Sequence, residues 1–172
     1  MSLTATSYRS NAKVPAAGAV IALAVIEPST SMGTAATGAN TDFHGSELLA
    51  VNAVAAYTVQ VPQNAVGLEL AYLWFTNSDS SPVLDASDTY TVDVSAGKTD
   101  DLVTATTDGI AAASLAQTAD NDLQRVDISA AFNTAGIIEA GNIVGIDVDK
   151  AAEGTAGDDP IMLACVLVFN VV

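Results

Sequence analysis

The sequence contains very few of the side chains that catalysis and metal binding usually need. Its 172 residues include one histidine, His44, and one cysteine, Cys165. A catalytic triad would have to use His44, but a nucleophile needs an oriented base close by and no G-x-S-x-G elbow is present. A single thiol forms neither an intramolecular disulfide nor a zinc site. We therefore expect His44 to be a turn or packing residue and Cys165 a small buried one.

Positive charge is equally scarce. Five lysines and arginines stand against 20 acidic residues, which gives a net charge of −15. Nucleic-acid binding needs a basic stripe that neutralises phosphates, and five scattered cations cannot form one. Anionic membrane surfaces would repel the chain for the same reason. The sequence thus predicts no nucleic-acid partner and no membrane partner.

Charged residues of both signs make up only 15% of the chain, against about 25% in typical domains. Much of the surface must then consist of small uncharged side chains, which suit packing against other subunits. Walker loops, dinucleotide fingerprints and H-E-x-x-H motifs are also absent. A glycosidase needs a carboxylate pair in a cleft, and the many acidic residues do not single one out. We expect no enzymatic activity, no catalytic residue and no cofactor.

Calcium is the one ion for which the sequence offers candidate ligands. Hard cations prefer several oxygen ligands, but no D-x-[DN]-x-[DN]-G motif is present. Acidic side chains cluster in one loop and alternate along one predicted strand, with a further acidic loop after that strand. The candidates are Asp79, Asp85 and Asp88 in the first loop, Asp147 and Asp149 on the strand, and Asp158 in the following loop.

The N-terminus combines a polar segment with an apolar run. Residues 14–26 follow Arg9 and Lys13 and resemble a signal peptide, but Glu27 ends the run far short of the ~20 residues of a membrane span. We expect a buried strand there. Residues 1–13 bury too little to fold alone, so we predict an arm that docks on a neighbouring subunit. Its predicted interface residues are Leu3, Tyr8, Arg9 and Lys13.

Short alternating apolar runs separated by turn residues dominate the rest of the chain. No amphipathic helix alternates with them, which disfavours a parallel α/β fold. The pattern predicts an all-β, single-domain antiparallel β-sandwich or jelly roll over residues 14–172, with about 8–10 strands and at most one or two short helical turns. The predicted strands are 18–27, 47–53, 57–61, 65–77, 90–94, 102–106, 123–128, 143–148 and 161–172, with a loop at 28–42 and a helical turn within 109–119.

The alternation also predicts which side chains form the core. In residues 65–77 the even-numbered apolar residues share one face, so we expect Trp74 to be buried rather than exposed as in a sugar-binding surface. The predicted core residues are Val59, Leu68, Leu70, Tyr72, Trp74, Val92, Ile128, Ile146, Leu163 and Val166.

The last third of the chain resembles viral jelly-roll capsid proteins. The resemblance rests on the segment EAGNIVGIDV at 139–148 and the apolar strand IMLACVLVFN at 161–170, preceded by TVQVP at 58–62. It implies a capsid decoration (cement) protein at the virion surface, a homotrimer that contacts a major capsid protein. Two alternatives stay open. One is a small single-jelly-roll capsid protein, and the other is a receptor- or carbohydrate-binding β-sandwich, which exposed aromatic residues with calcium nearby would favour.

Overall fold

The structure is a computed structural model that describes residues 20–26, 34–37, 44–77, 84, 87–98, 104–115, 123–152 and 159–172. Within these ranges the chain is almost entirely β-strand, with one short 3-10 helix. The elements are β1 (Val20–Ile26), β2 (Thr34–Thr37), β3 (His44–Glu47), β4 (Val54–Gln60), β5 (Ala65–Asn77), β6 (Thr89–Gly97), β7 (Thr104–Ser114), β8 (Gln124–Asp127), η1 (Ser129–Phe132), β9 (Ile143–Ala152) and β10 (Pro160–Val171). In this part of the chain no helix is long and apolar enough to cross a membrane.

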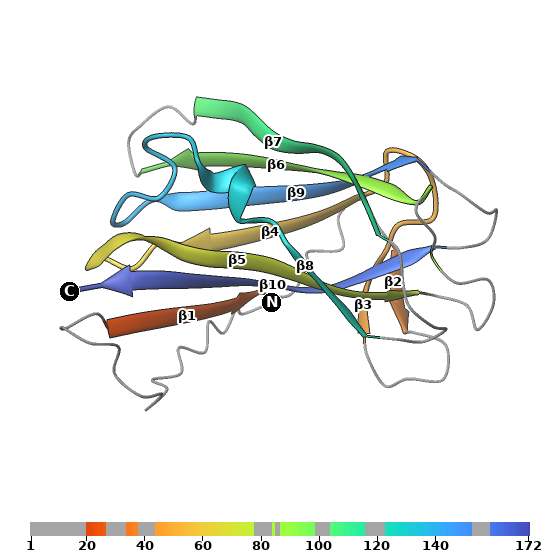
Figure 1. Ribbon diagram of the computed structural model, residues 1–172, viewed down its shortest axis with the longest axis horizontal. Coiled ribbons are helices and arrows are strands. Elements are labelled where there is room, and N and C mark those ends of the chain that lie inside the picture. The colour runs from red at the N-terminus through yellow and green to blue at the C-terminus, as the bar shows by residue number, and fades with distance from the viewer. Residues whose placement is uncertain are drawn as a thin grey trace.

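The strands form two antiparallel sheets that pack face to face (Figure 1). Sheet A has the order β2-β3-β10-β5-β8, and β1 also pairs with β10. Because β5 occupies one side of β10 throughout, β3 and β1 share the other side: β3 pairs with Ile161 and Met162, and β1 pairs with Cys165–Val171. Sheet B has the order β4-β9-β6-β7. The predicted all-β sandwich is confirmed.

The eight strands from β3 to β10 are wound as a jelly roll. The first of them pairs with the last, β3 with β10, and the second with the seventh, β4 with β9. The third pairs with the sixth, β5 with β8, and the two middle strands, β6 and β7, pair with each other. An antiparallel ribbon of four such pairs, folded over itself, places alternate pairs in opposite sheets. The chain therefore has a jelly-roll fold, the more specific of the two alternatives, β-sandwich or jelly roll, that the sequence predicted.

The core fills the space between the two sheets, and the strands supply it by alternation. In β4, for example, Tyr57 and Val59 point inward, whereas Thr58 and Gln60 are exposed. Four of the predicted core residues, Val59, Val92, Ile128 and Ile146, belong to this core, as does Cys165. Leu163 and Val166 are buried as predicted, but they lie outside the cluster between the sheets.

The predicted register of β5 is wrong over most of its length. Ala71, Leu73 and Phe75 point into the core, whereas Leu70, Tyr72 and Trp74 are half-buried on the opposite face. The cause is a β-bulge, because Phe169 pairs with Leu68 while the preceding Val168 pairs with Leu70, which leaves Glu69 as an extra residue. One extra residue reverses the alternation beyond it, so Leu68 packs against the core and Leu70 faces outward. A second bulge at Val66 leaves that side chain 64% exposed.

Three predicted segments also differ from the structure in the type of element that they form. The strand expected at 47–53 ends at Glu47, and a turn follows in which Asn52 has a positive φ of 71°. The helical turn expected within 109–119 is strand as far as Ser114, because pairing with β6 overrides the helix preference of alanine. The loop expected at 28–42 contains β2. The predicted arm, with Leu3, Tyr8, Arg9 and Lys13, lies outside the described residues.

Candidate functional site

Two neighbouring strands place aromatic and charged side chains together on the outer face of sheet A. Tyr72 of β5 pairs with Asp127 of β8, and Trp74 pairs with Arg125. Directly opposed residues in an antiparallel pair point to the same side of the sheet. Since Leu73 and Val126 between them pack on the core, these four side chains point away from it. The sequence analysis missed this grouping, because it assigned Tyr72 and Trp74 to the core.

The aromatic rings and Arg125 are in mutual contact. The ring centroids of Tyr72 and Trp74 lie 6.1 Å apart at an interplanar angle of 77°, an edge-to-face arrangement. The guanidinium carbon of Arg125 lies 4.9 Å from the Tyr72 ring centroid, within the range of a cation–π contact. Leu123, just before β8, is 41% exposed. We call Tyr72, Trp74, Leu123, Arg125 and Asp127 the aromatic patch.

Ser129, at the start of η1, fixes the end of β8 against β5. The Ala71 amide donates a hydrogen bond to the Ser129 hydroxyl oxygen (2.9 Å), and the same hydroxyl donates to the Ala71 carbonyl (3.3 Å). The Ser129 amide donates to the Asp127 carboxylate at 2.8 Å. Hydrogen bonds from the Ser129 side chain and backbone lower the pKa of Asp127, and the charge of Arg125 lowers it further. Asp127 is therefore ionised at neutral pH, and the hydrogen bond from Ser129 holds its carboxylate in position as an acceptor.

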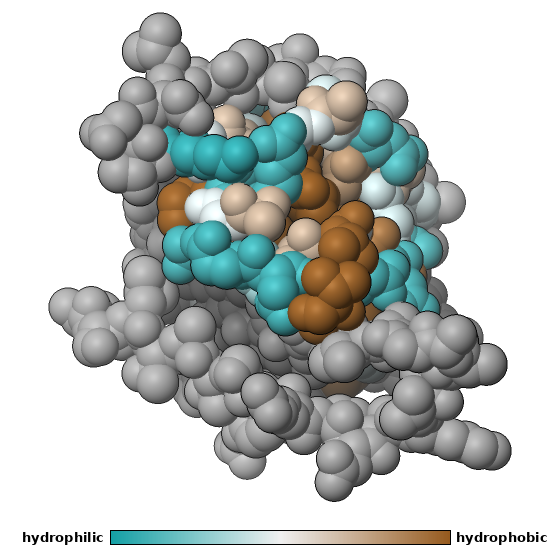
Figure 2. Space-filling view, turned by 90° about the vertical axis from the view of Figure 1, so that its left-hand side faces the viewer, coloured by the Kyte–Doolittle hydropathy of each residue, from teal (hydrophilic) through white to brown (hydrophobic). Residues whose placement is uncertain are grey.

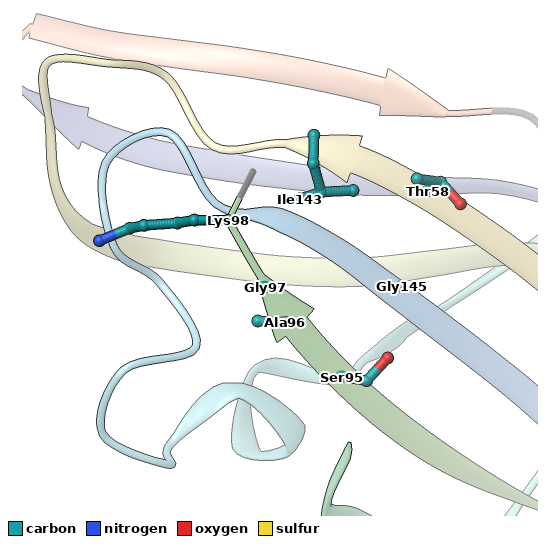
Figure 3. Close-up of a pocket in the computed structure, with 7 residues that line it drawn as sticks. All are labelled: Thr58, Ser95, Ala96, Gly97, Lys98, Ile143 and Gly145. Carbon is teal, nitrogen blue, oxygen red and sulfur yellow. The ribbon is translucent and has the colours of Figure 1, made fainter. Parts of the chain in front are cut away.

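The outer face of sheet B has a different character and contains a hollow of about 360 Å³. Its floor is a row across three strands, in which Gly145 of β9 lies between Thr58 of β4 and Ser95 of β6 (Figure 3). The missing side chain at Gly145 makes the space, because a Cβ there would come within 3.1 Å of the Ser95 hydroxyl. Lys98 extends away from both hydroxyls, and its ammonium pairs with Glu139 at 2.7 Å.

Beyond the hollow, the outer face of sheet B carries acidic side chains. Asp147 of β9 pairs directly with Asp93 of β6, and Asp149 is the next outward residue of β9. Partial burial and the charge of Asp93 raise the pKa of Asp147. The same two causes, with Asp147 as a third, raise the pKa of Asp149. We call Asp93, Asp147 and Asp149 the acidic row.

The acidic row does not have the arrangement of a calcium site. Among the residues that the structure describes, no group of three or more His, Cys, Asp or Glu side chains could hold a metal ion. Asp147 and Asp149 therefore do not belong to such a group, even though Asp93 lies directly opposite Asp147. Asp88 is fully buried beside the start of β6. The remaining candidates, Asp79, Asp85 and Asp158, lie outside the described residues.

One end of the sandwich exposes apolar side chains among hydrophilic ones (Figure 2). Val66 at the start of β5 and Val172 after β10 are both strongly exposed, and Ile143 is partly so. Asn64 ties the chain end to this region, because its side-chain amide donates to the Val172 carbonyl at 2.8 Å. The surface is small and carries no charged or aromatic side chain among these residues.

No protein-family model matches the sequence, and no curated protein matches it. Solved structures give distant matches. Dimeric latent PorU from Porphyromonas gingivalis is 11% identical, with a TM-score of 0.45, over 89% of this chain but only 13% of that protein. The CBM36-1 domain of a multidomain xylanase from a Trinervitermes trinervoides hindgut metagenome is 13% identical, with a TM-score of 0.42, over 85% of this chain and 95% of the domain.

A third match is TmCBM61, solved in complex with β-1,4-galactotriose. It is 11% identical, with a TM-score of 0.38, over 84% of this chain and 86% of that one. At such identities and TM-scores these likenesses assign no function to the chain. A functional argument has to rest on the side chains that this sandwich displays.

Proposed function

We propose that this protein is a non-catalytic carbohydrate-binding β-sandwich and that the aromatic patch is its ligand site. The observation that carries the proposal is the outward placement of Tyr72 and Trp74, half-buried and in contact with Arg125. A pyranose ring has an apolar face of C–H groups and an edge of hydroxyls. The patch offers rings on which the apolar face loses contact with water. Arg125 and Asp127 offer donors and an acceptor for the hydroxyls.

The aromatic patch fits a sugar better than the hollow on sheet B does. The hollow has two hydroxyl side chains, Thr58 and Ser95, but no aromatic residue among those that line it. Hydrogen bonds to hydroxyls largely replace bonds that the free sugar already makes with water, so they add little affinity alone. Binding sites usually combine an apolar lining with a few placed polar groups, and the aromatic patch has both.

The capsid decoration role, the trimer, the contact with a major capsid protein and the virion location remain predictions from the sequence. The jelly-roll winding is compatible with them and with sugar binding, because both capsid and lectin domains use this fold. The absence of enzymatic activity is likewise a prediction. A ligand-binding measurement discriminates between the two functions most directly.

The test is isothermal titration of the purified protein with soluble xylan, galactan, dextran and homogalacturonan. We expect at least one glycan to bind, and Trp74→Ala to weaken that binding about tenfold or more, as loss of an aromatic hot-spot residue does. The control is Val66→Ala, which removes an exposed apolar side chain at the apolar end of the sandwich. Circular dichroism verifies that both variants are folded. Unchanged binding in Trp74→Ala, or no binding to any glycan, would contradict the proposal.

A further inference from the structure

Arg125 is the one cation among the described residues that no carboxylate neutralises. The structure describes three of the five lysines and arginines: Lys98, Arg125 and Lys150. The Lys98 ammonium lies 2.7 Å from the Glu139 carboxylate, and the Lys150 ammonium lies 2.7 Å from that of Asp159. Arg125 has no ion pair and donates no hydrogen bond to a described residue, although the chain has four times as many acidic as basic residues.

The contact with Tyr72 holds Arg125 in place without using its donors. A cation–π contact acts through the face of the ring, whereas the five N–H groups of a guanidinium lie in its own plane. Arg125 is exposed, and its side chain belongs to the same face as Trp74, which it pairs with across the strands. The donors are therefore available beside an aromatic ring, in the planar fork geometry that matches a carboxylate.

Asp127 lies two residues from Arg125 on β8, and its pKa is lowered by hydrogen bonds from Ser129 and by the charge of Arg125, but its position limits how far it competes for the Arg125 donors. Its carboxylate accepts the Ser129 amide at 2.8 Å, which ties it to the chain that follows β8. No ion pair joins it to Arg125 in the described part of the structure, although the two charges influence each other. Asp127 can still accept a hydroxyl from a ligand that Arg125 holds by another group.

We infer that the aromatic patch binds a carboxylated sugar, a uronate unit, with its ring against Trp74 and its carboxylate on the Arg125 guanidinium. The inference rests on the proposed function and specifies its ligand class. The net charge of −15 repels a polyanion at long range. At about 0.15 M salt the Debye length is roughly 8 Å, so distant carboxylates are screened while the direct Arg125 contact is not.

The experiment compares each uronate oligomer with its own methyl ester, which keeps the sugar backbone but removes the charge. Titrations at 0.15 M NaCl use trimers of galacturonate, glucuronate and mannuronate, with wild type, Arg125→Gln, Arg125→Lys and Trp74→Ala. We expect wild type to bind at least one acid about tenfold or more tightly than its ester. Arg125→Gln should reduce that ratio to about one, because only the acid loses an ionic contact, whereas acid and ester lose the same hydrogen bonds to hydroxyls. Arg125→Lys should retain part of the ratio, because lysine keeps the charge but not the fork.

The outcomes separate this inference from the proposed function. Equal binding of acid and ester by wild type, or a ratio that survives in Arg125→Gln, overturns the uronate assignment. If Trp74→Ala still weakens the neutral ligands in that case, carbohydrate binding stands. Failure of every trimer together with every neutral glycan overturns both. Arg125 is exposed on an edge strand, so circular dichroism of Arg125→Gln should match that of wild type, and a folded variant keeps each outcome interpretable.

Discussion

The two outer faces of the sandwich differ in chemistry although one winding of the chain produces both. On sheet A, β5 and β8 display two aromatic rings beside Arg125, which forms no ion pair with a described residue. On sheet B, β4, β9 and β6 display hydroxyls around a glycine and then a row of aspartates. The inner faces of the same strands are mainly apolar, with the buried Lys150 of β9 as a charged exception. The fold thus fixes the alternation of the strands, and the outward residues alone determine what each face can bind.

The difference also has an energetic side. Half-buried aromatic rings on sheet A keep apolar area in contact with water, which is unfavourable unless a ligand or partner covers it. On sheet B partial burial, together with the mutual repulsion of the aspartates, raises the pKa of Asp147 and of Asp149. Neither the exposed part of the rings nor the repulsion stabilises the fold. In the proposed function a sugar covers the rings of sheet A, whereas the hollow and the acidic row have no aromatic ring to be covered.

The largest expected effect is a difference in the free energy of unfolding between substitutions on the inner and the outer side of β5. Leu73 is fully buried in the core, and Leu73→Ala should lower the free energy of unfolding by about 2–5 kcal/mol. Trp74, its neighbour on the outer side, is half-buried, so Trp74→Ala should cost no more than about 2 kcal/mol despite the larger side chain. Urea unfolding of both variants measures the difference. A larger loss for Trp74→Ala would mean that the outer face of sheet A supports the fold rather than a ligand.

The next largest effect is the difference in stability lost when a buried or an exposed ion pair is broken. Lys150 points inward from β9, and its pair with Asp159 has side chains only 1% and 13% exposed. Lys150→Met should cost about 3 kcal/mol, because removing one partner leaves a poorly solvated charge. The control is Lys98→Met, whose pair with Glu139 has the same 2.7 Å separation but side chains 42% and 55% exposed. That variant should cost less than about 1 kcal/mol. Equal losses in thermal unfolding would refute the role of burial.

Local patterns in the sequence predicted most strands, because alternation and turn residues act over a few neighbours. They predicted β5 in full, from residue 65 to residue 77, and the core positions of Val92 and Ile146. They failed where a distant partner decides. The bulge at Glu69 depends on the pairing of β5 with β10, more than 90 residues away in sequence, and it moved Trp74 to the outer face.

The candidate site was missed for the same reason. The alternation over residues 123–128 predicted a strand there, but nothing local identified β5 as its partner. Sequence reasoning instead listed Asp147 and Asp149 among the candidate calcium ligands, since a carboxylate can be recognised from its residue type alone. Their surroundings, which depend on β6, do not form a metal site among the described residues.

A smaller effect should appear when one member of the acidic row is neutralised. Asp93→Asn should raise the free energy of unfolding at pH 7 by about 0.2–1 kcal/mol, because Asp93 directly opposes Asp147. The raised pKa values mean that the folded protein holds these protons more tightly, so stability falls as pH rises through the range above 3.8. The gain of the variant should therefore vanish below about pH 3.8, where both states are protonated. A gain that persists at pH 3 would exclude charge repulsion as its cause.

The smallest expected effect concerns the outer face of sheet B, where a substitution should change neither stability relative to its control nor glycan affinity appreciably. Gly145→Ala partly fills the hollow of sheet B, and its Cβ would lie 3.1 Å from the Ser95 hydroxyl, which can rotate away. The matched control is Gly67→Ala on β5, where nothing lies within 4 Å of the added carbon. Both variants reduce the entropy of the unfolded chain, worth about 0.4–1 kcal/mol, so Gly145→Ala should be at most slightly less stable than Gly67→Ala.

Neither alanine should change glycan affinity, because both positions lie away from Trp74 and Arg125: Gly145 belongs to the opposite sheet, and Gly67 pairs with Asn170 at the far end of β5. Titration with the same ligands measures this, beside thermal unfolding for stability. Loss of binding in Gly145→Ala alone would mean that the ligand binds in the hydroxyl-lined hollow and not at the aromatic patch. The sugar would then be held mainly by Thr58 and Ser95, and Trp74→Ala should leave its affinity unchanged. The two variants together therefore decide which face of the sandwich binds.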